Sequence, residues 1–149
     1  MFVEVYDDAL PAVVWLFTGS TNAPDDHQRW LTSMARCDSA FGARRGVGVL
    51  IIDDGSPPPP AAVREQITAA ARAIRGTSPL AVVTSSGLAR TIIVGLDVAG
   101  IVAFPVKGFA AVEAAVQWLA RPAVGAVDHV AVLELVEEAR ARAVVARGA

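Results

Sequence analysis

The chain has 149 residues, of which 54% are hydrophobic and 19% charged, and its formal net charge at pH 7 is -2. This length suits a single domain with a sizeable core, and the composition is that of a compact globular protein rather than a disordered one. A net charge so close to zero provides no field that would gather nucleic acid or anionic lipid, so we expect neither as a partner.

The first forty residues predict a strand pair followed by a helix. Residues 2–6 alternate apolar and polar side chains, and residues 12–17 form a denser apolar run. Two antiparallel strands joined by a short turn fit this pattern best. A helix is then predicted to begin, because capping residues occur from Ser20 onward, a proline stands at position 24 and two aspartates follow it. The apolar face of this helix should pack on the sheet.

Residues 47–54, with the sequence VGVLIIDD, are the stretch around which we arrange the other elements. This run is apolar, rich in branched side chains and too short for a helix, which predicts a strand buried on both faces. After a run of prolines, apolar residues at helical spacing between Val63 and Ile74 predict a helix. Residues 80–85 then predict a second buried strand.

The next helix is predicted to begin at Ser85 or Ser86. Its apolar residues include Ile92, Ile93 and Val94 and occupy more than one side. A helix of that kind is either deeply buried or paired, so we expect these three residues at an interface. The apolar run of residues 101–104 predicts a third core strand, which Pro105 would end.

A helix carrying Phe109, Val112, Val116 and Leu119 on its inner side should follow, and a last helix should run from Asp128 to about residue 147. The apolar side predicted for this last helix carries Val130, Leu133, Val136, Ala143 and Val144. It either folds back on the sheet or binds a second copy of the chain, and we select Leu133 and Val136 as interface candidates.

Strands that alternate with helices in this way indicate an α/β fold. We expect a mixed, mainly parallel sheet of four to five strands, to which the first strand pair adds an antiparallel edge. Residues 1–121 form this domain in our interpretation, and residues 122–149 form a C-terminal helical extension.

Polar side chains follow the two central strands where each strand ends. Asp53 and Asp54 come after the first of them, and Ser85 and Ser86 after the second. Side chains in these positions face a shared crevice in a parallel sheet, so they are candidate ligand-binding residues. The simpler interpretations are a solubilising acidic loop and a helix N-cap. No set of His, Cys or acidic residues has the spacing of metal ligands, and we expect neither a metal nor a cofactor.

Several stretches together resemble the SpoIIAA-like branch of the STAS superfamily, small bacterial domains related to anti-sigma-factor antagonists. The match covers about residues 2–119 and rests on the strands 13–17, 49–53 and 80–85, the helix around Arg29-Trp30, the Phe104-Pro105 pair and residues 114–119. The resemblance implies helices packed mainly on one face of the sheet, and a regulatory, non-enzymatic role exercised through protein contacts.

The resemblance also implies a candidate phosphorylation site. In antagonists of this family, a serine of an Asp-Ser-Ser-Gly segment opens the helix after the central strand, and its phosphorylation breaks partner binding. Here Asp53-Asp54-Gly55-Ser56-Pro57 replaces that segment, and Ser56 is the only hydroxyl left in the loop. The proline directly after Ser56 departs from the family pattern.

The leading interpretation is a non-enzymatic regulatory or scaffolding module that acts on a protein partner or as a homodimer. The alternative is a domain that binds a small ligand, such as a phosphate, nucleotide or lipid, with the loops after the parallel strands. No nucleophile, base and orienting group can be assembled from the sequence. A single cysteine, no recognisable secretory signal and no apolar run long enough to span a membrane predict a soluble, cytoplasmic protein.

Overall fold

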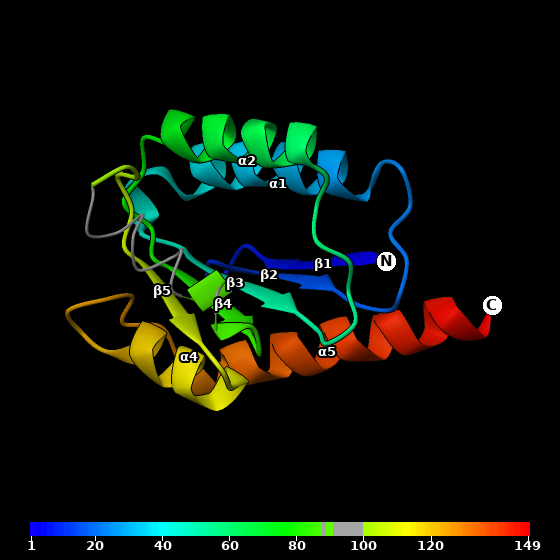
Figure 1. Ribbon diagram of the computed structural model, residues 1–149. Coiled ribbons are helices and arrows are strands. Elements are labelled where there is room, and N and C mark those ends of the chain that lie inside the picture. Colours follow the sequence, from blue (N-terminus) through cyan, green and yellow to red (C-terminus); the bar gives the residue numbers. More distant parts are fainter. Residues whose placement is uncertain (88, 91–99) are drawn as a thin grey trace.

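The computed structural model of the protein describes residues 1–87, 89–90 and 100–149. The strands are β1 (Phe2–Asp7), β2 (Ala12–Phe17), β3 (Val47–Ile52), β4 (Leu80–Thr84) and β5 (Val106–Phe109). The helices are α1 (Asp26–Phe41), the short 3-10 helix η1 (Gly42–Arg44), α2 (Ala61–Ala73), α4 (Val112–Ala120) and α5 (His129–Gly148). The strands form one sheet, with α1 and α2 on one face and α4 and α5 on the other (Figure 1).

The strands lie in the order β1-β2-β3-β4-β5, with β1 antiparallel to β2 and every other pair parallel. This confirms the predicted mixed sheet with an antiparallel edge. In the register of the parallel strands, Phe17 pairs with Ile52, and Ile52 pairs with Thr84. The strands β2, β3 and β4 therefore end level with one another, and the residues that follow them share one edge of the sheet.

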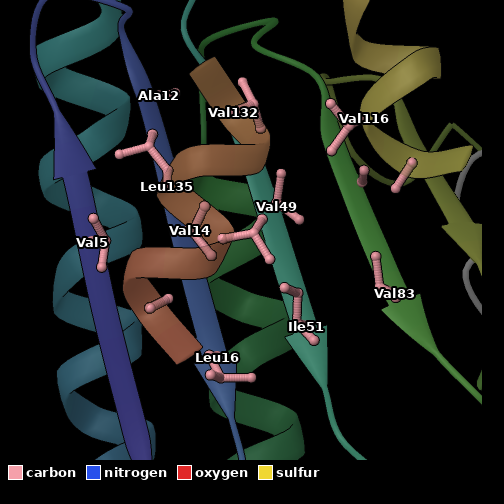
Figure 2. Packing of buried hydrophobic residues seen from close by; sticks show 14 of the residues in the cluster. Val5, Ala12, Val14, Leu16, Val49, Ile51, Val83, Val116, Val132 and Leu135 are labelled. Atoms are coloured by element: carbon pink, nitrogen blue, oxygen red, sulfur yellow. The ribbon is translucent and has the colours of Figure 1, made fainter. Parts of the chain in front are cut away.

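The face covered by α4 and α5 is tightly packed. Alternate side chains of β2 and β3, such as Leu16 and Ile51, point to this face and are buried. Figure 2 shows Val132 and Leu135 of α5 lying over this layer of strand residues. Burial of an aliphatic side chain contributes about 1.5 to 3 kcal/mol, so this layer is a major source of stability.

The opposite face is packed less evenly. Trp15, Phe17 and Leu50 of the sheet contact Trp30 and other apolar residues of α1, and all are buried. By contrast, α2 has no buried residue, although its apolar side chains face the same layer. The close packing on this side thus comes from α1, whereas α2 leaves room between itself and the sheet.

The arrangement of the helices on both faces corrects the expectation that they pack mainly on one. Parallel strands as apolar as β3 need cover on both sides. The connections from β2 to β3 and from β3 to β4 step along the sheet in the same direction, and their fixed handedness puts α1 and α2 on the same face. After β5, the helices α4 and α5 cover the other face.

The third core strand is not residues 101–104, as predicted, but Val106–Phe109. Pro105 lies just before this strand and not after it, and its carbonyl accepts a hydrogen bond of 2.8 Å from the backbone N–H of Leu80. A proline has no N–H to donate but retains its carbonyl, so it can begin pairing as well as end it. Phe109 accordingly ends β5, and the next helix begins at Val112.

Helix α5 packs against β1, β2 and α4 of the same chain. Its buried side is made up of Val132, Leu135, Val136, Ala139 and Ala143. Of the side predicted from the sequence, Val136 and Ala143 are buried and Leu133 is partly buried, whereas Val130 and Val144 are 52% and 67% exposed. Val136 is thus buried in the core of its own chain and Leu133 packs partly against that core, and an interface with another chain at these residues stays a prediction.

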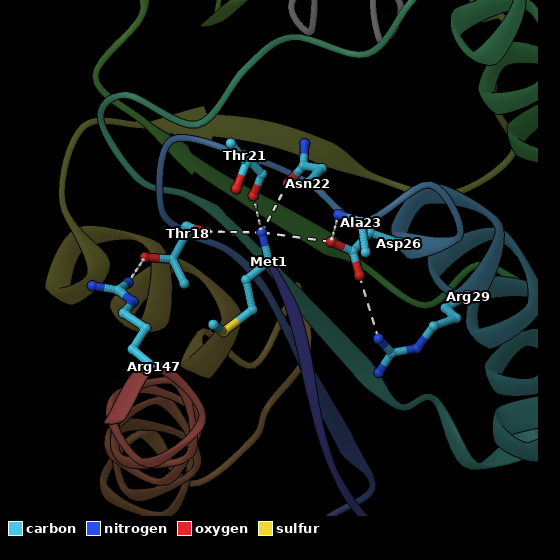
Figure 3. A network of polar contacts seen from close by, with 8 residues as sticks. All are labelled: Met1, Thr18, Thr21, Asn22, Ala23, Asp26, Arg29 and Arg147. Carbon is cyan, nitrogen blue, oxygen red and sulfur yellow. Dashed lines mark hydrogen bonds and ion pairs between the residues drawn. The ribbon is translucent and has the colours of Figure 1, made fainter. Parts of the chain in front are cut away.

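Polar contacts hold the beginning of the chain against α1 and α5 (Figure 3). The amino group of Met1 donates to the carbonyl of Thr18 at 3.0 Å and lies 3.5 Å from the buried carboxylate of Asp26. Asp26 also pairs with Arg29 at 3.3 Å, and Arg147 of α5 donates to the hydroxyl of Thr18. The end of α5 is therefore fixed beside the end of β2.

Among the residues that the structure describes, no helix is both long and apolar enough to cross a membrane.

Candidate functional site

The edge where β2, β3 and β4 end brings the predicted polar residues together. Asp53 continues the pairing of β3 by one residue, since its N–H donates to the carbonyl of Phe17 at 2.9 Å. The hydroxyl of Ser85 donates to the carboxylate of Asp54. The loops after β3 and β4 thus meet at the crevice expected from the sequence.

A tight turn directs the chain away from this edge. The N–H of Ser56 donates to the carbonyl of Asp53 at 3.1 Å, and Gly55 between them has a φ of +83°, a conformation that favours glycine. Prolines 57 to 60 follow and lead into α2. Because these residues have no N–H to donate, the segment cannot add to the sheet and instead passes over the crevice.

Below this loop lies a cavity of about 510 Å³, which we call the outer cavity. Its apolar wall comprises Phe17, Trp30, Leu50, Ile52 and Ile67, and its polar rim comprises His27, Asp53, Asp54, Ser56, Ser85 and Ser86. The volume is within the range of small-molecule sites, which also combine an apolar wall with a few polar groups. All four predicted ligand-binding residues are on its rim.

Two polar atoms of the lining residues are buried without a hydrogen-bonding partner in the described part of the chain. They are Nε1 of Trp30 and Oγ of Ser56. Trp30 is only 7% exposed. Most buried polar groups are paired, and a buried donor without a partner costs about 1 to 3 kcal/mol. Both atoms belong to residues that line the outer cavity but are themselves shielded from it, so a ligand would reach them only after a small movement of the side chain or loop.

His27 contributes a neutral polar group to the rim. Its ring stacks on Phe17, with 5.2 Å between the ring centroids. Partial burial lowers the pKa of His27, and the nearby positive amino group of Met1 lowers it further, while the carboxylate of Asp26 acts in the opposite direction. The imidazole is thus uncharged at neutral pH and offers one donor and one acceptor.

A second, polar crevice of about 530 Å³ lies on the α5 side of the same edge. Arg140 reaches Asp53 there at 3.5 Å between Nη1 and Oδ1, and Arg147 also lines it. The charge of Asp53 is partly compensated by this contact. Asp54 accepts from Ser85 and forms no ion pair with the described residues, so the rim of the outer cavity retains negative charge.

The remaining predicted residues are the candidate phosphorylation site Ser56 and the interface candidates Ile92, Ile93 and Val94. The hydroxyl of Ser56 is buried, so its modification would require the loop to open. Ile92, Ile93 and Val94 lie outside the described residues. The described part of the chain contains no cluster of three or more His, Cys, Asp or Glu side chains that could bind a metal ion.

Sequence reasoning did not assign Trp30, His27 or Ser56 to a ligand cavity. Trp30 lies on the apolar side of α1, where a tryptophan normally indicates packing. The one signal in the sequence was the proline run after Ser56, since it predicts a segment that cannot pair with the sheet. Comparisons of the chain with protein-family models, curated proteins and solved structures found no significant match.

Proposed function

We propose that the protein is a non-enzymatic binding domain that takes a small amphipathic molecule into the outer cavity. The observation that carries the proposal is the outer cavity itself, in which an apolar wall meets the polar residues that follow β3 and β4; within the described part of the chain, two of its lining residues, Trp30 and Ser56, also have a buried polar atom without a partner. A ligand with an apolar body and a hydrogen-bond acceptor would bury against the wall and satisfy the indole N–H.

The charges at the rim restrict the polar part of this ligand. Asp53 and Asp54 both line the outer cavity, and Arg140 compensates only the first of them. His27 adds no positive charge at neutral pH because burial lowers its pKa. An uncharged polar group is therefore favoured over an anionic one.

A regulatory role through a protein partner, the leading interpretation from the sequence, stays a prediction. Of its interface candidates, Val136 is buried in the core and Leu133 packs partly against it, and residues 92–94 lie outside the described part. Ligand binding has better support because the residues proposed for it meet around one cavity.

The test is a thermal-shift screen with 1-octanol, nucleotides and inorganic phosphate as probes. Binding to the folded state raises the melting temperature, and we expect a saturable rise with 1-octanol alone. Ile67→Trp places a bulky side chain in the cavity wall and should abolish that rise. Ala69→Trp is the matched control, since Ala69 is an exposed residue of the same helix.

Trp30→Phe tests the role of the indole N–H. It retains an aromatic wall but removes the donor, so the affinity for 1-octanol should fall about fivefold to tenfold, the equivalent of one hydrogen bond. Unchanged affinity in both Trp30→Phe and Ile67→Trp would refute the proposed site. Absence of a shift with every probe would refute the proposed function.

A further inference from the structure

A second cavity, of about 260 Å³, adjoins the outer one between α2 and the sheet; we call it the inner cavity. The two share the lining residues Trp30, Leu50, Ile52, Ile67 and Ala89. The described residues that line only the inner cavity include Met34, Ala71, Leu80, Val82, Phe104 and Val106. All of its described lining is apolar, whereas the outer cavity has a polar rim.

The packing of α2 explains why this space exists. Ile67 and Ala71 are only partly buried, although they face the apolar side of β3 and β4. The prolines before α2 also keep the connection from pairing with the sheet. The result is a slot whose described walls are α1, α2, the sheet and, at Ala89, Val102 and Phe104, the two ends of the connection between β4 and β5, with polar groups at the end where the strands terminate.

We propose that the ligand is a single-chain amphiphile, with its alkyl chain in the inner cavity and its uncharged polar end at the outer rim. This inference rests on the proposed function and specifies its ligand class. The outer cavity has a polar rim and the described lining of the inner cavity is apolar, which fits a molecule that is polar at one end and apolar along the rest of its length. Trp30 lines both cavities, and its indole N–H has no partner in the described part of the chain, so a small shift of this side chain would let it donate to the polar end.

A homologous series of 1-alkanols, from 1-hexanol to 1-tetradecanol, tests this inference. Each methylene that leaves water for an apolar cavity should lower Kd about fourfold. We expect this gain to continue as the chain fills the inner cavity and to stop once the cavity is full. Alkanoates of equal length should bind more weakly, because their carboxylate faces Asp53 and Asp54.

Ala71→Phe separates the two cavities, since Ala71 lines the inner but not the outer one. The shortest alkanols should bind this variant as they bind the wild type, whereas the gain for longer chains should disappear. Ala69→Phe, on the exposed side of α2, should leave the whole series unchanged. Ala71→Leu is a milder substitution and should end the gain at an intermediate length if Ala71→Phe does not fold.

The outcomes separate the inference from the proposed function. If alkanols bind but Kd does not change with chain length, or if neither variant at Ala71 affects long chains, the inference is wrong and the outer site stands. If alkanoates bind as tightly as alkanols, the uncharged polar end is wrong. If no alkanol of any length binds, both proposals fail.

Discussion

Two valines of the same helix should respond oppositely to the same substitution. Val136 is 2% exposed and Val144 is 67% exposed. Val136→Ala removes two buried carbon atoms, which corresponds to about 1.6 kcal/mol of transfer free energy. With the cavity left behind, we expect the free energy of unfolding to fall by about 2 to 3 kcal/mol and the melting temperature by roughly 5 to 10 °C. Val144→Ala should change stability by less than about 0.5 kcal/mol, slightly upward because alanine favours helix.

Urea unfolding monitored by circular dichroism measures both effects. The loss in Val136→Ala should not depend on protein concentration, because Val136 packs within its own chain. If α5 instead bound a second chain, the loss would vary with concentration, as it does for any interface. A concentration-dependent loss, or equal effects of the two substitutions, would refute the packing described for α5.

Further substitutions and one truncation test other parts of the fold. Asp128 caps α5 by accepting from two backbone N–H groups, so Asp128→Ala should cost about 1 kcal/mol in urea unfolding, and Asp128→Ser should restore most of it. Asp26→Asn removes a buried charge paired with Arg29 and should cost about 1 to 3 kcal/mol, more than Arg29→Gln at its exposed partner. Burial lowers the pKa of His27, so the unfolded chain binds the proton first and the free energy of unfolding should fall as pH is lowered through about 6.5. His27→Gln should lack this decrease in unfolding measurements between pH 8 and pH 5. A chain that ends at Arg121 exposes one face of the sheet and should show no cooperative unfolding; a transition like that of the full chain would contradict this.

The strands were predictable where the pattern was local. The run VGVLIIDD has no polar alternation and lies between turn residues, which is enough to identify a strand buried on both faces, and β3 is found there. The antiparallel first pair was predictable for the same reason, because its turn is short. The error at Pro105 arose because a proline limits a strand at either end, and the sequence does not say which.

Features set by tertiary packing were not predictable. Val130 and Val132 of α5 are the same residue type two positions apart, yet one is exposed and the other is buried. With apolar residues on several sides of the helix, periodicity could not identify the side that meets β1 and β2. The candidate site was likewise predictable only in part. The polar rim followed from the strand ends, whereas the cavity depends on how far α2 lies from the sheet.

The placement of α5 also determines when the fold can be completed. This helix is near the end of the sequence, yet it covers β1 and β2, which are made first. During synthesis from the N-terminus, the apolar side chains on that side of the first two strands, such as Val5 and Val14, have no cover until residues 129–148 have left the ribosome. Until then the nascent chain carries an exposed apolar surface, of the kind that chaperones bind and that promotes aggregation.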